Sequence, residues 1–152
     1  MAFEFNNAVE TVKKYLTLID DFKAKYGMEV NETSINSDPL LFIGVIKTEN
    51  LADFIKDIEA CFGEPYKRGG DPAHYANLND AFIIDIGGVR ADQILYSIPV
   101  YERTNFYCAI WPWTSKPEFT SVRLGLIAYS RKFQADFTAE LEGVFKKYKN
   151  IA

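Results

Sequence analysis

Pro112 lies between two tryptophans, in the run Trp111-Pro112-Trp113. Proline has no amide hydrogen to donate and its ring fixes φ, so it is excluded from the interior of a helix and from the middle of a sheet. The strand predicted over residues 106–111 therefore ends or bulges here, at an edge or rim of its sheet. Two indole rings then lie near the end of a strand, where they can cover the core, line a ligand pocket or contact another protein.

The chain has the size and composition of one globular domain, which we place at residues 1–152. It has 152 residues, of which 48% are hydrophobic and 25% are charged. A chain of this length buries roughly 68–70% of the surface that its unfolded form exposes, so its core needs neither a disulfide nor a metal. We therefore expect Cys61 and Cys108 to be small buried hydrophobic residues.

Charge and motif content exclude several classes of function. The net charge is −4 and the 17 basic residues are dispersed, whereas duplex binding requires clustered cations, so we expect no nucleic acid partner. His74 is the only histidine, which removes any metal site that needs two imidazoles. The sequence contains no specific phosphate, metal or catalytic motif, and we expect no metal and no cofactor.

The N-terminal sequence and the hydropathy predict a cytoplasmic protein without membrane contact. Residues 1–14 lack the basic segment and the apolar core of a secretory signal. No apolar run approaches the roughly 20 residues that span a bilayer. A reducing compartment also agrees with two cysteines that have no structural role.

Apolar residues recur at helical spacing in three segments. The first helix is predicted over residues 7–26, with Asn7 as its N-cap and Gly27 just beyond its end. The second covers residues 51–62 and stops at Gly63. The third follows Ser130, a good N-cap, and its last apolar residue is Tyr148.

Strand-like segments fill much of the remaining chain. Residues 40–46 form a continuous apolar run, typical of a central strand buried on both faces, and residues 28–39 are predicted to be a connection. Two hairpins are expected, one from residues 74–78 and 81–86 and one from residues 93–102 and 106–111. Residues 120–128 alternate as an amphipathic strand with one side facing water.

The order of these elements, α-β-α-β-β-β-β-β-α, predicts an α+β fold. It favours a single curved, largely antiparallel sheet of about five to six strands with the helices packed on one face. A fold of this class assigns no activity, so function has to be inferred from a site.

An aromatic group around the proline is the strongest candidate binding site. If the C-terminal helix packs against a curved sheet, one concave and mostly apolar cavity would be lined by Tyr96, Tyr101, Tyr107, Trp111 and Trp113. On the outer face the same rings would instead form a patch that docks another protein or a second copy of the chain, as in a homodimer. Simple coverage of the core by the two indoles is the third interpretation.

Two ionisable residues extend this candidate site. Asp85 falls within the apolar segment 82–86, where an inward-facing carboxylate would be costly unless it is paired, and the alternative is that it faces water. Arg123, on the polar side of its strand, could pair with Asp85 or hold an anion in a pocket. We assign no catalytic residue from these observations.

A non-enzymatic cytoplasmic binding domain, docking a partner protein through the sheet surface around Trp111 and Trp113, is the function that these features favour. The alternative is a domain that binds a small apolar or aromatic ligand in a cavity between the sheet and the C-terminal helix. An enzyme with Asp85 as general base and Arg123 holding an anionic substrate is the third hypothesis.

Overall fold

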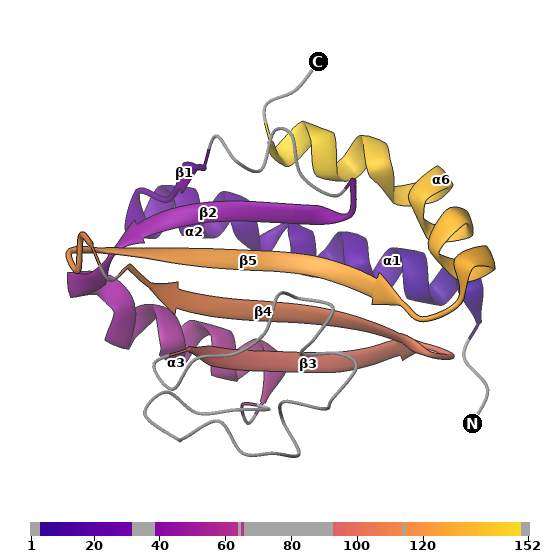
Figure 1. Cartoon of the computed structure of the whole chain (residues 1–152), viewed down its shortest axis with the longest axis horizontal. Helices are drawn as coiled ribbons and strands as arrows, with labels where there is room; N and C mark the ends of the chain where they lie inside the picture. Colours follow the sequence, from indigo (N-terminus) through magenta and orange to yellow (C-terminus); the bar gives the residue numbers. More distant parts are fainter. Residues whose placement is uncertain (1–3, 32–38, 64, 66–92, 114, 150–152) are drawn as a thin grey trace.

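The described residues form one five-stranded antiparallel sheet with helices packed against it (Figure 1). The structure is a computed structural model, which describes residues 4–31, 39–63, 65, 93–113 and 115–149. The strands, in the spatial order β1-β2-β5-β4-β3, are β1 (Glu29–Val30), β2 (Leu41–Lys47), β5 (Phe119–Ala128), β4 (Thr104–Pro112) and β3 (Ile94–Tyr101). The helices are α1 (Phe5–Leu16), α2 (Leu18–Tyr26), α3 (Leu51–Phe62) and α6 (Arg131–Tyr148), and the short 3-10 helix η2 (Thr48–Asn50) precedes α3. The predicted α+β architecture is confirmed, while the predicted hairpin at residues 74–86 lies outside the described residues.

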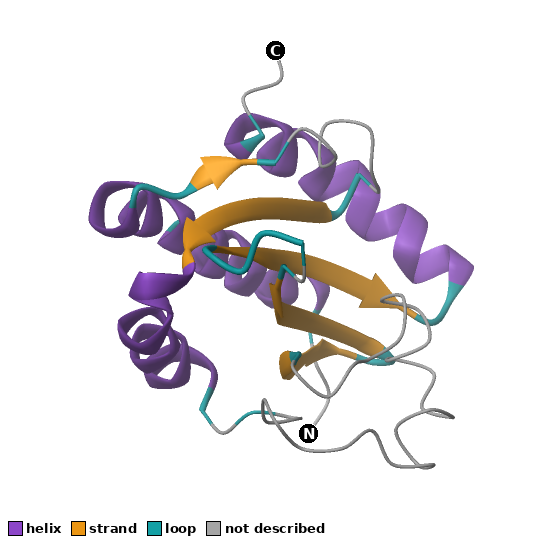
Figure 2. Cartoon of the chain, turned by 60° about the vertical axis from the view of Figure 1, so that its left-hand side comes forward, coloured by secondary structure: helices purple, strands orange, loops and turns teal. Residues whose placement is uncertain are grey.

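The described helices all pack on the same face of the sheet, as the sequence predicts (Figure 2). Alternate side chains of the central strands point toward this face. For example, Leu124 of β5 lies opposite both Phe42 of β2 and Cys108 of β4, and all three side chains belong to the main core. Burying each large apolar side chain there stabilises the fold by about 1.5–3 kcal/mol, as an upper estimate. The aromatic side chains that are at most 1% exposed are Phe42, Phe54, Tyr96, Phe106, Phe137 and Phe145.

The N-terminal helical segment is broken at Thr17, where the sequence predicts a single helix. At this point the backbone hydrogen bonding tightens to a spacing of three residues, because the Asp20 amide donates to the Thr17 carbonyl at 3.1 Å. The Thr17 hydroxyl also donates a hydrogen bond to the Lys14 carbonyl at 2.6 Å. The helix also begins earlier than predicted, with Glu4 rather than Asn7 at the N-cap position. Its predicted end is confirmed, because Gly27 adopts a left-handed conformation with φ of 64° that suits glycine.

A short edge strand lies where the sequence predicts only a connection. β1 pairs with β2 through the register pair of Glu29 with Val45. Met28 packs closely over Gly44, since a Cβ atom added at that glycine would lie 2.6 Å from the Met28 sulfur. β2 is therefore an interior strand, and Phe42 and Ile43, on its two faces, are both buried as predicted.

The hairpin of β3 and β4 is confirmed, with a tighter turn and one irregularity. β4 begins at Thr104, and Arg103 in the turn has a positive φ of 50°. A β-bulge shifts the pairing of β3 between Pro99 and Tyr101. A bulge inserts one extra residue and reverses the alternation beyond it, so Tyr101 faces the helices instead of the opposite face.

The predicted boundaries of the other two helices are confirmed. α3 covers residues 51–62 and ends at Gly63, whose φ of 78° is disfavoured for residues with a side chain. Ser130 caps α6, because its hydroxyl oxygen accepts a hydrogen bond from the Phe133 amide at 3.4 Å.

The two cysteines differ in exposure, and the prediction that both are buried is wrong for Cys61. Cys108 in β4 is fully buried, and burial raises the pKa of its thiol. Cys61 is exposed because it lies in the last turn of α3, beside the buried line of Phe54, Ile58 and Phe62. Partial desolvation raises the pKa of the Cys61 thiol, and the Asp57 carboxylate raises it to a lesser extent.

We predict that one thiol per chain reacts with a thiol reagent in the native protein. The thiolate is the reactive species, so Cys61 should react slowly at neutral pH and faster as the pH rises. Cys108 should react only after unfolding, and a Cys61→Ser variant should show no native reaction. Colorimetric thiol titration with and without denaturant measures both, and two reactive native thiols would contradict the burial of Cys108.

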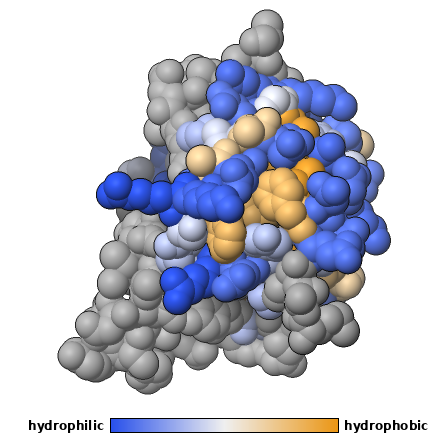
Figure 3. Space-filling model, turned by 90° about the vertical axis from the view of Figure 1, so that its right-hand side faces the viewer, coloured by the Kyte–Doolittle hydropathy of each residue, from blue (hydrophilic) through white to orange (hydrophobic). Residues whose placement is uncertain are grey.

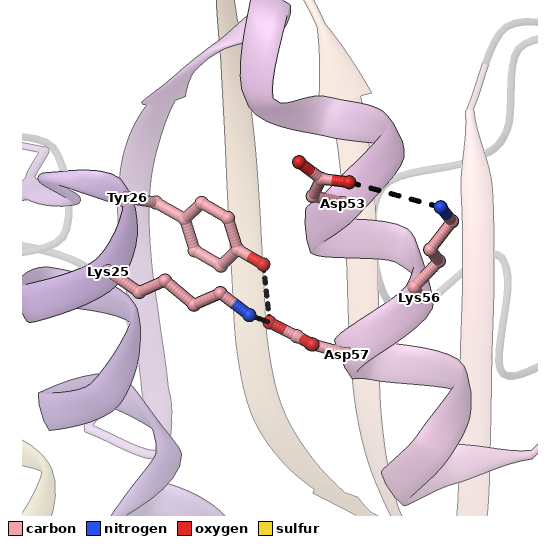
Figure 4. Close-up of polar contacts among 5 residues, drawn as sticks. All are labelled: Lys25, Tyr26, Asp53, Lys56 and Asp57. Atoms are coloured by element: carbon pink, nitrogen blue, oxygen red, sulfur yellow. Dashed lines mark hydrogen bonds and ion pairs between the residues drawn. The ribbon is translucent and has the colours of Figure 1, made fainter.

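A polar cluster ties α2 to α3 (Figure 4). The Asp57 carboxylate on α3 accepts hydrogen bonds from the Tyr26 hydroxyl and, at 2.9 Å, from the Lys25 ammonium. Both hydrogen bonds lower the pKa of Asp57, and the one from Tyr26 has the larger effect. One turn earlier on the same helix, Asp53 lies 4.0 Å from the Lys56 nitrogen, with both side chains largely exposed.

Removal of the Asp57 carboxylate should lower the free energy of unfolding at neutral pH. We expect Asp57→Ala to cost about 1 kcal/mol or less, since the carboxylate is 35% exposed and solvent screens its interactions. Because folding lowers this pKa, the stabilisation is present above the unfolded-state value of about 3.9 and is lost as the pH falls through the folded-state value. Urea denaturation from neutral to acidic pH measures both effects.

The control for this variant is Glu140→Ala, which removes an exposed carboxylate from the middle of α6, away from the first turn of that helix. Its loss should be smaller, because Glu140 makes no hydrogen bond or ion pair with any described residue and does not interact with the N-terminal end of the helix dipole. An equal loss of unfolding free energy in the two variants would contradict a stabilising contact between α2 and α3 through Asp57. A loss for Asp57→Ala that persists unchanged in acid would contradict it as well.

Candidate functional site

The candidate site lies on the outer face of the sheet, which we define as the face opposite the four α-helices. It is centred on the two longest strands, β4 and β5. The side chains of Leu95, Tyr107 and Ala109 form a second buried apolar cluster on this face, separate from the main core, with Trp111 packed against it. Leu95, Tyr107 and Ala109 are therefore buried parts of this face, and Trp111 is only partly accessible.

Three consecutive cross-strand pairs on this face each place one large side chain opposite a small residue. Directly opposed residues on paired strands have Cβ atoms only about 4.5–5.5 Å apart, so a large side chain can extend over a small partner. The large residues alternate between the two strands and thus interdigitate along the face. From the β4 end to the β4 start, the pairs are Trp111 with Ser121, Arg123 with Ala109, and Tyr107 with Gly125.

Arg123 stacks on the Trp111 ring in the middle of this row. The central carbon of the guanidinium lies 3.7 Å from the ring centroid, well within the range of a cation–π interaction. Arg123 Nε and Trp111 Nε1 are both buried, and neither has a hydrogen-bond partner among the described residues. Burial lowers the pKa of Arg123 and the nearby Tyr107 opposes that shift, yet a guanidinium remains charged at physiological pH.

Trp113 extends the row beyond the proline. Its indole N–H donates a hydrogen bond to the Ser121 hydroxyl at 2.6 Å, and its ring lies 5.5 Å from that of Phe119. Pro112 is the last residue of β4, so the strand ends where the sequence predicts. Trp111 and Trp113 are both half-buried, which leaves part of each ring accessible.

Four of the residues predicted for the site come together, and two do not. Tyr107, Trp111, Trp113 and Arg123 lie together at the outer face. Tyr96 points to the helix-covered face, where it is 1% exposed and its hydroxyl donates a hydrogen bond to Glu59 at 3.3 Å. The sheet therefore separates Tyr96 from the rings of Tyr107, Trp111 and Trp113.

Tyr101 lies at the far end of the helix-covered face. The β-bulge places its ring 5.0 Å from Phe133, 5.5 Å from Phe137 and 5.8 Å from Phe5. Figure 3 views this end of the molecule and shows apolar side chains gathered there within a hydrophilic border. A single cavity lined by all five predicted aromatic residues is therefore not formed by these strands.

The expectation that one side of β5 faces water is wrong for its middle. Ser121 is only 8% exposed, Gly125 is buried and Arg123 is half-buried. The reason is the packing of large β4 side chains over these small residues. Asp85, which the sequence offers as a partner for Arg123, lies outside the described residues.

Sequence reasoning missed the roles of Ser121 and Gly125 in this site. The hydroxyl of Ser121 holds the Trp113 indole, and Gly125 provides the space beneath Tyr107. The available signal was the alternation of small residues with Arg123 in β5. It cannot be interpreted without the register against β4.

No protein family, curated protein or solved structure matches this chain. Within the described part of the chain, no helix is long and apolar enough to cross a membrane. The same residues contain no group of three or more histidine, cysteine, aspartate or glutamate side chains that could hold a metal ion. A function is therefore inferred from the chemistry of the site itself.

Gly125→Ala should destabilise the protein by about 1–3 kcal/mol, the usual range for overpacking. An added Cβ would lie 2.7–2.8 Å from the hydroxyl and ring atoms of Tyr107, which would have to move. In a Tyr107→Ala background the same substitution should cost little, because the contact is gone. Urea denaturation of the four proteins in this cycle measures the coupling.

The control is Gly143→Ala in α6, where an added Cβ meets no atom within 4 Å. It should stabilise the protein by about 0.5–1 kcal/mol, because alanine favours a helix more than glycine does. The close packing of Tyr107 on Gly125 would be contradicted if Gly125→Ala were neutral in the otherwise unchanged chain.

Proposed function

We propose that this protein is a non-enzymatic binding protein that docks a partner protein through the outer face around Trp111 and Trp113. The observation that carries the proposal is the stack of Arg123 on Trp111, at 3.7 Å, with a buried nitrogen of each side chain lacking a partner among the described residues. Buried donors without acceptors are rare and costly in a folded protein. Contacts that another molecule makes with the exposed part of this stacked pair would offset part of that cost.

The composition of the outer face also supports protein docking. Tryptophan, tyrosine and arginine are the residues enriched at the energetic centres of protein interfaces. Here Trp111 and Arg123, both half-buried, are neighbours on paired strands, and Trp113 is fixed beside them by Ser121. Side chains held in this way lose little conformational freedom when a partner binds.

The alternatives receive less support. The space between the sheet and α6, where a small-molecule cavity was expected, contains the fully buried rings of Phe137 and Phe145. A cavity of about 700 Å³ does lie beside α6, but it is an open depression between the outer side of that helix and Tyr129. The enzyme hypothesis depends on Asp85, which is outside the described residues.

A cytoplasmic location remains part of the proposal. Both cysteines are free thiols, as is usual in a reducing compartment. This observation agrees with the location predicted from the sequence.

The test is affinity capture from the organism's own extract with the full chain and matched variants. Trp111→Ala should lose a partner that the unsubstituted chain retains, because it removes both the ring and the support of Arg123. Tyr129→Ala, which removes a 37% exposed ring at the end of β5, should retain that partner. Thermal unfolding must first establish that both variants are folded.

Partner retention by a folded Trp111→Ala variant would contradict docking on the outer face. Sedimentation of the purified chain identifies the case in which the partner is a second copy. Self-association that Trp111→Ala abolishes would assign the outer face to a homodimer.

A further inference from the structure

We propose that the group bound by Arg123 is the carboxylate of an acidic side chain on the partner protein. This inference rests on the proposed function and specifies its chemistry. The Arg123 guanidinium makes no hydrogen bond or ion pair with any described residue, although its Nε is buried. A partly desolvated cation that no described carboxylate neutralises is unfavourable, and an incoming carboxylate would compensate it.

The charges on the outer face favour an anion. The chain as a whole carries 21 acidic and 17 basic residues. In contrast, the outward-facing positions of β2, β3, β4 and β5 include no acidic residue, and their ionised side chains are Arg123 and Lys47. The nearest carboxylate on the same face of the described sheet is that of Glu29 in β1, two strand spacings, or about 10 Å, away from β5.

The geometry of Arg123 favours a carboxylate over other acceptors. Stacking on Trp111 fixes the plane of the guanidinium, and the buried Nε directs recognition to its two terminal nitrogens. These two nitrogens form a planar fork that matches the two oxygens of a carboxylate. Arginine is much better suited to this bidentate contact than lysine is.

The surroundings of Arg123 would strengthen such a contact. Trp111 lies on one side of it along the face and Tyr107 on the other, one residue pair away in each direction. Aromatic side chains around a charged pair exclude water in the complex, and a hydrogen-bonded pair in a water-poor setting is stronger than an exposed one. The carboxylate would therefore be an anchor at the centre of the interface.

The test uses end-capped peptides and NMR of the full chain. The probe is acetyl-tetraglutamate amide, and acetyl-tetraglutamine amide is the matched peptide without carboxylates. The glutamate peptide should shift the indole N–H signal of Trp111 and the Nε–H signal of Arg123, with a response that weakens as salt is added. The two indole signals are assigned with Trp113→Phe.

Variants of Arg123 identify the contact. Arg123→Gln should abolish the shift of the Trp111 signal, and Arg123→Lys should weaken peptide binding by about tenfold because it keeps the charge but loses the fork. Equal shifts with the glutamine peptide, or none with the glutamate peptide, would overturn the inference. A response to a glutamine peptide with a free C-terminus, in the absence of one to the capped glutamate peptide, would also overturn it.

Failure of this inference can be separated from failure of the proposed function. If Trp111→Ala loses the captured partner while a folded Arg123→Gln variant retains it, the outer face docks a protein without using a carboxylate. If both variants retain the partner, the outer face is not the docking surface and both proposals fail. Loss in both variants, together with the peptide response, supports both.

Discussion

The register of β4 against β5 is the constraint on which both faces of the sheet depend. It places Phe106, Leu124 and their alternate neighbours in the core and leaves Trp111 and Arg123 on the outer face. A slip of one residue would exchange the two sets and move the Arg123 charge beneath the helices, where no described carboxylate of the sheet could pair with it. The arrangement that buries the core is therefore the same one that stacks Arg123 on Trp111.

Local sequence patterns predict much of the fold because local physics decides it. Helical spacing and the stop signals Gly27 and Gly63 locate helix ends, and Ser130 locates the start of α6. The missing detail is not local: β1 has two residues, too few to establish a period, and it exists because β2 offers it an edge. The break at Thr17 is a local change in backbone hydrogen bonding, from the Asp20 amide to the Thr17 carbonyl, which apolar spacing does not record.

The candidate site is only partly predictable for a related reason. Alternation within one strand places Tyr107 and Trp111 on a common face, and Pro112 correctly marks the end of that strand. Alternation cannot relate one strand to the next, so it could not exclude Tyr96 from the same group. It also fails at the bulge of β3, which turns Tyr101 toward the helices. The pairing of Arg123 with Trp111 required the three-dimensional register.

The short edge strand has a consequence for how this sheet opens. β1 is held to the rest of the sheet by two register pairs, whereas β4 and β5 share nine. Amide hydrogens near β1 are thus expected to exchange with solvent through local fraying, and those of β4 and β5 only through global unfolding. Trp111 and Arg123 lie on these two strands, so fraying at the β1 edge is expected to leave their stack undisturbed.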